Sequence, residues 1–339
     1  MASLNQTHVT AVAGALLVAL VTTLLFKRVR KEKIPTKWTE VGSVRGIYIY
    51  PLKSGKGQQT SKVLCTSKGL KEIDKGDGCT PLADRCFLIY TSKDRQVRTA
   101  RQLPKIVLIE VQPAQNGVIF SAPSMTDLYI NLPRVANNVT AVSVWGKTFG
   151  DESFACTDCG DTIAKWLSTY LLGKPEGLRL GYGDGSAFRN ILRDHANWVK
   201  YYTKLDNYSS GIFSDLAPLH LINQASLDDL NQKLPDDRKI TERNFRPNIL
   251  INGPEAFAED KWQYLKIGEV TAKVTLECLR CVETTVTDEG ALDSNREPLK
   301  TLSSYRKSEG PFKSPPMGIY LKVLVPGRIT DGDKILVSK

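Results

Sequence analysis

The sequence predicts a β-rich α+β protein that carries one apolar segment at its N-terminus. Short runs of β-branched and aromatic residues recur along the first half of the chain, separated by clusters of Gly, Pro, Asn and Asp. Few helical patterns lie between them, whereas a parallel sheet needs connecting helices. We therefore expect antiparallel or barrel-like β units. The 339 residues are enough for about two domains.

The apolar segment covers residues 9–26 and follows a short tail of residues 1–8. As a helix it would span about 27 Å, close to the roughly 30 Å of a bilayer core. A basic, Pro-containing tether over residues 27–41 follows it, whereas a cleaved signal peptide carries its basic residues before the apolar run. The segment is therefore predicted to be a retained transmembrane signal anchor. The positive-inside rule places the rest of the chain on the cytosolic side.

The first domain is expected over residues 42–174 and consists mainly of strands. Alternating aromatic and β-branched residues, bounded by turn residues, mark each strand. A helix follows over 161–172, because its apolar residues recur at helical spacing and Gly173 and Pro175 end the pattern. We place the domain boundary after this helix. The expected strands are 44–52, 85–91, 106–111, 117–121, 127–132 and 141–145.

The second domain is expected over residues 175–339. Ser226 and Asp229 have the spacing of a capping box and predict a helix over 226–234. Residues 183–215 are rich in Gly, Asn, Asp and Tyr without a clear period, so we expect long loops near a site or a partner surface. The expected strands are 247–252, 269–277, 318–325 and 334–337.

Several functional classes lack their usual sequence support. The net charge of +10 is spread thinly beyond the basic tether, without a block of basic residues interleaved with aromatics, so no nucleic-acid partner is expected. The chain contains no HExxH, GxSxG, GxGxxG or P-loop motif. Hydrolase, Rossmann and NTPase functions are therefore not indicated, and the chain has no nicotinamide or flavin fingerprint of its own.

The cysteines carry the main chemical signal. Among the seven cysteines, two pairs have C-x-x-C spacing, Cys156–Cys159 and Cys278–Cys281. A Cys₄ zinc site is one alternative, but more than a hundred residues separate the pairs, unlike a zinc ribbon. A disulfide or buried apolar packing is another. Arg280 stands beside Cys281 and favours the thiolate, the form of cysteine that binds metals.

Two further segments carry cationic groups in a restrained setting. Lys53 and Ser54 follow an expected strand and precede a glycine, a combination that can bind phosphate or simply end a strand. Arg246 precedes Pro247, which favours an extended backbone at the arginine. An arginine held in this way can bind a phosphate or a planar heterocycle, or close a loop.

These motifs, in this order, resemble those of the MOSC-domain proteins that bind molybdenum cofactor. The matching segments are YPLKS at 50–54, ADRCFLIY at 83–90, NFRPNILI at 244–251 and CLRC at 278–281. With the N-terminal anchor added, the chain resembles the mitochondrial amidoxime-reducing component family. The resemblance implies a MOSC β-barrel domain packed with an N-terminal MOSC-associated β domain.

The resemblance also implies the site. Cys281 would be the catalytic residue and the molybdenum ligand, while Cys278 would be a neighbour. The chain departs from the family at Leu216 and Ala217, where small hydroxyl residues are common before the proline, and at Leu279, where serine occurs. The residues expected to bind the molybdenum cofactor (a molybdopterin) are Lys53, Ser54, Arg85, Ala217, Pro218, Arg246, Asn248, Leu279, Arg280 and Cys281.

The implied activity is the reduction of N-hydroxylated compounds, namely amidoximes and hydroxylamines. Electrons would come from cytochrome b5 and its NADH-dependent reductase. The anchor would hold the protein in the mitochondrial outer membrane as a single-pass protein facing the cytosol, with the endoplasmic reticulum as the alternative. The competing hypotheses are a membrane-tethered molybdenum-cofactor carrier or sulfur-handling module without turnover, and a Cys₄ zinc interaction protein.

Overall fold

The computed structural model describes most of the chain downstream of the predicted anchor. A compact unit begins at Trp38 and contains every helix and strand that the structure describes. The predicted tail, the anchor at 9–26 and residues 27–31 of the tether lie outside the described residues. Within the described part, no helix is both long and apolar enough to cross a membrane. The described residues are 32–132, 139–143, 153–187, 189–207 and 210–338.

The largest sheet has eight strands and closes into a barrel. It closes because β14 pairs with both β13 and β1, while β2 extends it from β1. All neighbours are antiparallel except β13 and β14. The strands, in order around the sheet, are β14 (Ile249–Asn252), β13 (Leu219–Asn223), β17 (Pro316–Val325), β16 (Val270–Leu279), β15 (Tyr264–Ile267), β19 (Lys334–Ser338), β1 (Thr39–Ile49) and β2 (Gln58–Thr60).

Alternate residues of the barrel strands fill its interior. Ile319, Leu321 and Val323 of β17 belong to one apolar cluster with Ala272 and Val274 of β16. This period of two is that of a strand whose successive side chains point to opposite faces. The alternation explains why the sequence alone indicated most of these strands.

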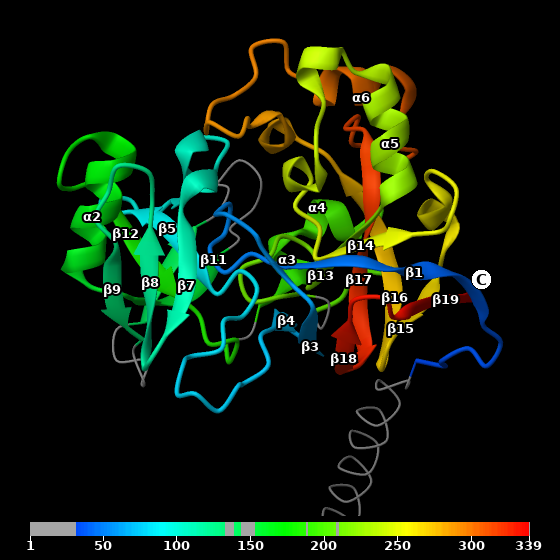
Figure 1. Cartoon of the computed structure of the whole chain (residues 1–339), viewed down its shortest axis with the longest axis horizontal. Coiled ribbons are helices and arrows are strands. Elements are labelled where there is room, and N and C mark those ends of the chain that lie inside the picture. The colour runs from blue at the N-terminus through cyan, green and yellow to red at the C-terminus, as the bar shows by residue number, and fades with distance from the viewer. Residues whose placement is uncertain (1–31, 133–138, 144–152, 188, 208–209, 339) are drawn as a thin grey trace, which may run out of the picture. The chain divides into compact units, whose positions relative to one another are not determined.

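Helices cover the outer face of one part of the barrel. Ile222 and Leu250 point away from the interior and pack with Leu230 and Leu302. Figure 1 shows α5 and α6 beside each other over these strands. Since β13 and β14 are buried on both faces, they read as continuous apolar runs. The helices are α5 (Gln224–Lys233), α6 (Leu299–Tyr305) and the short 3-10 helices η2 (Asp236–Arg238), η3 (Glu242–Asn244), η4 (Ala258–Lys261) and η5 (Val282–Thr285).

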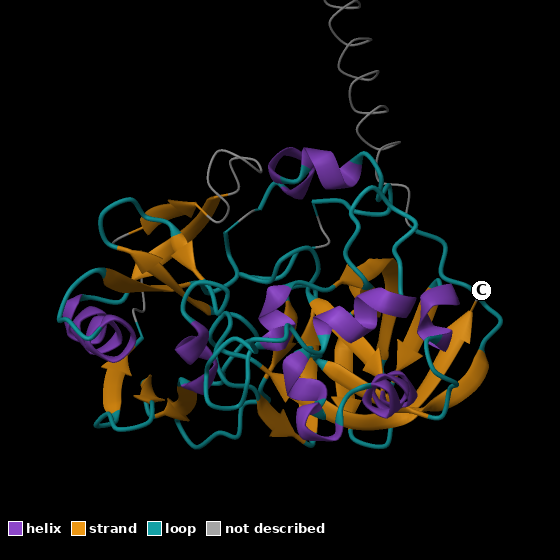
Figure 2. Cartoon of the chain, turned by 90° about the horizontal axis from the view of Figure 1, so that it is seen from above, coloured by secondary structure: helices purple, strands orange, loops and turns teal. Residues whose placement is uncertain are grey.

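A second β unit lies beside the barrel and has two apolar faces. Phe87 and Ile89 of β5 (Phe87–Thr91) pack with Ile163 and Leu167 of α2 (Asp161–Leu172), whereas Leu88 packs on the opposite face of the sheet. Figure 2 shows these strands and α2 grouped apart from the barrel strands. The five-stranded sheet runs β10 (Val139–Ser143), β11 (Ser153–Asp158), β12 (Leu178–Tyr182), β5 (Phe87–Thr91) and β6 (Val97–Arg98), and a separate meander consists of β7 (Glu110–Ala114), β8 (Gly117–Ser121) and β9 (Leu128–Asn131).

Strands cross between the two expected sequence domains. The N-terminal β1 belongs to the barrel, and β12, which follows the expected boundary, belongs to the second unit. A third sheet joins β3 (Lys62–Thr66) and β4 (Gly69–Lys71) to β18 (Gly327–Thr330), near the C-terminus. The division into 42–174 and 175–339 stays a prediction, and the sheets tie both parts together.

The β-rich barrel architecture is confirmed, and α2 and β8 cover the predicted residues. Two local predictions were wrong. Residues 104–108 form a 3-10 helix, η1 (Pro104–Leu108), within the expected strand 106–111, because Pro104 starts a turn that Ile109 closes onto Ile106. The N-cap of α5 is Asn223, whose side chain accepts from the Ala225 N–H, and not Ser226.

The expected loop region 183–215 contains two short helices, α3 (Ile191–Asp194) and α4 (Ala196–Val199). The remainder of the described part of this segment is loop. Arg189 is buried and donates to the carbonyl oxygens of Ser214 at 2.6 Å and Asp215 at 3.0 Å. This contact ties the two ends of the segment together.

Candidate functional site

Nine of the ten predicted site residues line one cleft, which we call the cationic cleft. Pro218 is buried and does not line it. The side chains come from segments that follow β1 and β16, precede β5 and β14, and lead into β13. The nine are Lys53, Ser54, Arg85, Ala217, Arg246, Asn248, Leu279, Arg280 and Cys281.

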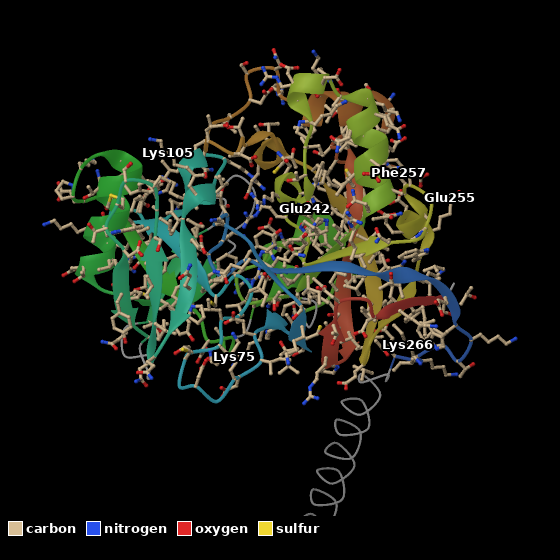
Figure 3. The ribbon with its side chains drawn as sticks, in the orientation of Figure 1. Lys75, Lys105, Glu242, Glu255, Phe257 and Lys266 are labelled. Atoms are coloured by element: carbon tan, nitrogen blue, oxygen red, sulfur yellow. The ribbon has the colours of Figure 1, made fainter. Side chains whose placement is uncertain are left out.

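The backbone at three of these residues is left-handed, which is uncommon outside glycine. The φ angles are 64° at Ser54, 48° at Arg85 and 56° at Arg246. The prediction of an extended Arg246 was therefore wrong. Its N–H donates to the Glu242 carbonyl at 2.9 Å and so closes the end of η3, near Glu242 in Figure 3. Backbone strain of this kind persists where the surroundings enforce it, often at functional sites.

Arg85 and Arg246 hold each other's position through shared partners. Both guanidinium groups contact the ring of the buried Tyr50, at 4.6 and 4.3 Å from its centroid. Arg85 also donates to Asp84 and, at 3.2 Å, to Asn248 Oδ1. Arg246 donates to the Gly55 carbonyl at 2.6 Å. The two positive groups are therefore fixed before any ligand binds.

Lys53 is buried and is held by the loop that precedes β13. Its Nζ donates to the Phe213 carbonyl at 2.9 Å and to Asp215 Oδ1 at 2.6 Å. Desolvation would raise the pKa of Asp215, but Lys53 and Arg101 outweigh it and hold the pKa well below its usual range. Asp215 is thus an anion that orients the lysine.

Arg280 points to Cys278 rather than to Cys281. It donates to the Cys278 sulfur, to the Phe245 carbonyl at 2.7 Å, and contacts His220 Nε2 at 3.3 Å. Burial lowers the pKa of His220 well below its ordinary value, and the charge on Arg280 lowers it further. The imidazole is therefore neutral and can accept from the arginine. The charge on Arg280 also lowers the pKa of the Cys281 thiol, in the direction expected from the sequence, although Arg101 has the larger influence.

Cys281 lies just beyond the end of β16 and is partly exposed. Its carbonyl accepts from the Thr284 N–H at 3.1 Å and from the Thr284 hydroxyl at 2.8 Å. Burial raises the pKa of its thiol, and the largest opposing influence is Arg101. Arg101 follows β6 in the second β unit, and no local motif marked it in the sequence. Sequence reasoning also missed Asp215, Glu283, His220 and Tyr320.

The cleft has an excess of positive charge. Five cationic side chains line it against two carboxylates, Asp215 and Glu283. Two buried donors, Arg246 Nη2 and Arg280 Nε, have no hydrogen-bond partner among the described residues. A buried donor without a partner costs about 1–3 kcal/mol, so an anionic ligand rich in acceptors would relieve this cost. The residues present therefore fit a phosphate-bearing cofactor. The five cations are Lys53, Arg85, Arg101, Arg246 and Arg280.

Two further hollows meet the cleft at Cys281. The first, which we call the apolar chamber, has a volume of about 310 Å³. The second, which we call the basic recess, has a volume of about 580 Å³. Arg280 and Cys281 line all three. The chamber is lined by His195, Trp198, Leu216, Leu276, Leu279 and Tyr320, with Arg101, Asp215 and Ser314. The recess is lined by Arg296, Lys300 and Lys313, with Val282, Leu299, Ser303, Ser314 and Pro315.

The first C-x-x-C segment, Cys156–Cys159, does not line the cationic cleft. Cys156 is buried in an apolar cluster of the five-stranded sheet, and Cys159 packs in the cluster around α2. All seven cysteines are free. Among the described residues, no group of three or more His, Cys, Asp or Glu side chains could hold a metal ion. The described side chains therefore provide no support for a Cys₄ zinc site.

Comparison with known proteins agrees with this architecture. The MOSC N-terminal beta barrel domain matches residues 41–174, and the MOSC domain matches residues 210–336. The chain is 34% identical over 320 residues to Mitochondrial amidoxime reducing component 2 of Rattus norvegicus, which covers 92% of this chain and 88% of that protein. The chain belongs to the mitochondrial amidoxime-reducing component family. The resemblance drawn from the four sequence motifs is thereby confirmed.

Other members of this family show similar agreement. Mitochondrial amidoxime-reducing component 1 of Homo sapiens is 34% identical over 302 residues, covering 87% of this chain and 83% of that protein. Mitochondrial amidoxime-reducing component 1 of Danio rerio is 33% identical over 325 residues, covering 95% and 92%. The similarity therefore extends over both β units.

Proposed function

We propose that this protein binds molybdenum cofactor in the cationic cleft and reduces N-hydroxylated compounds. The observation that carries the proposal is the cleft itself. Fixed cationic groups surround a cavity, two of their buried donors have no partner within the described part of the chain, and the Cys281 thiol lies at its edge. The family relationship and the printed names of the relatives, which describe amidoxime reduction, support the same activity.

The side chains divide the task of holding the cofactor. Lys53, Arg85, Arg246 and Arg280 would bind its phosphate and the oxygen-rich pterin edge, since arginine forms paired bonds with such groups. Cys281 would be the thiolate ligand of the molybdenum, which favours sulfur donors. Among the remaining predicted positions, Ala217 and Leu279 have no polar side-chain atoms and can contribute only backbone groups. The bound cofactor supplies the two electrons of the reduction.

The proposed reaction removes one oxygen atom from nitrogen. The N–O bond of the substrate breaks, the substrate takes up two electrons and two protons, and the oxygen leaves as water. An amidoxime becomes an amidine, and a hydroxylamine becomes an amine. Tyr320 faces both the cleft and the chamber, and burial raises its pKa well above the ordinary value. Its hydroxyl therefore stays protonated at neutral pH and can donate a hydrogen bond there.

We further propose that the electrons come from cytochrome b5, which its NADH-dependent reductase reduces. Each cytochrome carries one electron, so two are oxidised per substrate. The basic recess supports an acidic partner, because Arg296, Lys300 and Lys313 line it and no described residue of its wall carries a carboxylate. The recess also reaches Cys281, which brings a docked donor close to the proposed metal position.

The proposed location is the mitochondrial outer membrane. Residues 9–26 would span it once and leave the body in the cytosol. The relatives are named as mitochondrial, which supports this location over the endoplasmic reticulum. Imaging of residues 1–40 fused to a fluorescent reporter tests it. Reticular fluorescence that excludes mitochondria would contradict the proposal.

Two measurements test the activity. Elemental analysis of the purified protein is expected to find molybdenum, and zinc in equal amount without molybdenum would refute the cofactor assignment. NADH-dependent reduction of benzamidoxime with cytochrome b5 and its reductase is then expected to yield benzamidine. A molybdenum-loaded protein without turnover would instead favour a cofactor carrier.

The recess is tested by charge reversal. Lys300→Glu with Lys313→Glu is expected to raise the KM for cytochrome b5 about tenfold, because two favourable charges become repulsive. Turnover with a small chemical reductant should stay unchanged. Lys75→Glu with Lys105→Glu is the matched control, since both exposed lysines line none of the three hollows (Figure 3). An equal effect of the control would mean that only net charge matters.

A further inference from the structure

The apolar chamber has walls of a different character from the cleft that it joins. Leu216 and Leu276 form an apolar cluster there with Leu205, and Trp198 and Tyr320 pack against the same cluster. Arg101, Asp215 and Cys281 line both the chamber and the cleft, so these polar groups lie where the two hollows join. The chamber therefore combines an apolar cluster in its wall with a polar junction at Cys281.

An aromatic stack holds the chamber wall in place. The Trp198 ring stacks on Phe312 with centroids 4.1 Å apart and planes 17° apart, and it stacks on Tyr202 at 5.6 Å. These residues come from two separate segments, one around α4 and one after α6. A Cβ at Gly310 would lie 2.7 Å from the Tyr202 hydroxyl, so the second segment passes the first closely at that glycine.

Further contacts join the segment 183–215 to the rest of the site. Lys322 of β17 pairs with Asp206 at 2.5 Å. Arg189 holds the loop that carries Asp215 and Leu216 through the carbonyls of Ser214 and Asp215. Segment 183–215, which the sequence predicted to form only long loops, thus contributes to the chamber wall. It also carries the residues that hold Lys53.

The size of the chamber limits what it can accept. A cavity of about 150 Å³ is enough to hold a benzene ring, and the chamber has about 310 Å³. Leucine and tryptophan side chains bury apolar groups favourably and give no hydrogen bond to a small polar ligand other than through the indole N–H.

We infer that the apolar chamber is the substrate subsite, that it selects N-hydroxylated compounds with an aromatic or branched apolar group, and that Trp198 and Leu216 determine this preference. The inference rests on the proposed function. The apolar group lies between these two side chains, and the N–OH group points to the polar junction at Cys281. Small polar N-hydroxylated compounds leave the chamber wall unfilled and bind weakly.

The test compares two probes with the same reacting group, benzamidoxime and acetamidoxime. Binding to the cofactor-loaded protein is measured by calorimetry without an electron donor, so neither probe is consumed. The wild-type protein is expected to bind benzamidoxime at least tenfold more tightly. Trp198→Ala and Leu216→Asn should each reduce this ratio to about two or less, while the molybdenum content stays unchanged.

Tyr201→Ala is the matched control, because Tyr201 lies in the same segment, is 52% exposed and does not line the chamber. It should keep the wild-type ratio. Melting curves show whether Trp198→Ala or Leu216→Asn fails to fold. If one of them does, the binding ratio of the other variant tests the inference. Equal binding of the two probes to the wild type, or an equal loss of both in folded chamber variants, overturns the inference.

The same data separate this inference from the proposed function. Selective binding without turnover in the complete electron-transfer assay would support the subsite and refute the proposed reductase activity. Turnover of both probes with the same KM and kcat would support the reductase activity and refute the proposed subsite.

Discussion

The two C-x-x-C segments have identical spacing and opposite surroundings. Cys156 lies on β11 in one apolar cluster with Val142 and Phe154, and burial raises the pKa of its thiol to about 12. Cys281 lies beyond the end of β16, where three hollows meet. A thiol packed in an apolar cluster stays protonated and inert, whereas one at the edge of a cationic cleft can ionise and bind a metal.

The charged residue between the two cysteines of each C-x-x-C segment also differs, since it is Asp158 in the first segment and Arg280 in the second. Asp158 places a negative charge near Cys156 and Cys159, and this adds to the effect of burial in raising the pKa of both thiols. Arg280 instead opposes the effect of burial at Cys278, and Arg101 and Arg280 oppose it at Cys281. The spacing of two cysteines is therefore a weaker guide to their chemistry than the charge of their tertiary neighbours.

The largest expected effect separates the two segments by activity. Cys281→Ala should lower benzamidoxime reduction more than 100-fold, because the metal loses its thiolate ligand. Cys156→Ala should keep the rate within about twofold and lower the melting temperature, because it leaves a cavity in a packed cluster. NADH oxidation in the complete assay and thermal melting measure both. A comparable loss of rate in the two variants would remove the proposed difference between the segments.

The arginines beside the two segments should differ nearly as much. Arg280→Met should lower the molybdenum content of the purified protein about tenfold, because a buried donor group for the cofactor is lost. Arg179 pairs with Asp158 beside the first segment, and Arg179→Met should leave the molybdenum content unchanged. Metal analysis of both variants checks this. Full molybdenum content in folded Arg280→Met would mean that Arg280 serves only Cys278.

Cys278→Ala should have a smaller effect than Cys281→Ala. The sulfur accepts from Arg280 inside the protein and does not need to ligate the metal, so turnover should fall by less than about tenfold. Cys278→Ser keeps an acceptor for Arg280 and should restore most of the rate. Steady-state kinetics of both variants test this. A loss as large as that of Cys281→Ala in both would indicate that the two thiols act together.

The smallest expected effect concerns stability alone. Burial would raise the pKa of Asp158, but hydrogen bonds from Arg179 and Tyr90 outweigh it and lower the pKa to about 2. A carboxylate with a lowered pKa stabilises the fold above its unfolded pKa, about 3.9, and loses that contribution as the pH falls toward 2. Asp158→Asn should therefore cost about 1–2 kcal/mol at pH 7 and less near pH 2.5.

Urea unfolding of both proteins at several pH values measures this difference. The activity of Asp158→Asn at neutral pH should equal that of the wild type, since Asp158 lines none of the three hollows. A constant difference in the free energy of unfolding across this pH range would show that the Asp158 charge is not its source.

Local patterns in the sequence were sufficient for much of the fold. Alternate residues of β16 and β17 fill the barrel, and α2 repeats its apolar residues at helical spacing and ends at Gly173. Such signals depend on residues a few positions apart, so they can be recognised without knowledge of the tertiary structure. The apolar run at 9–26 is a signal of the same kind. Pro104 at the start of η1 and the buried Ser226 within α5 show where short patterns failed.

By itself, the sequence determined the β-rich class, the family and the cationic segments around Lys53, Arg246 and Cys281. Each of these depends on patterns of residues that are close together in the chain. Only the tertiary structure decided that Arg101 influences the Cys281 thiol more than Arg280 does, and that Trp198 and Leu216 meet in one chamber. The physical reason is that these contacts join segments far apart in the chain. Their geometry follows from how the barrel and the second β unit pack, which no local pattern encodes.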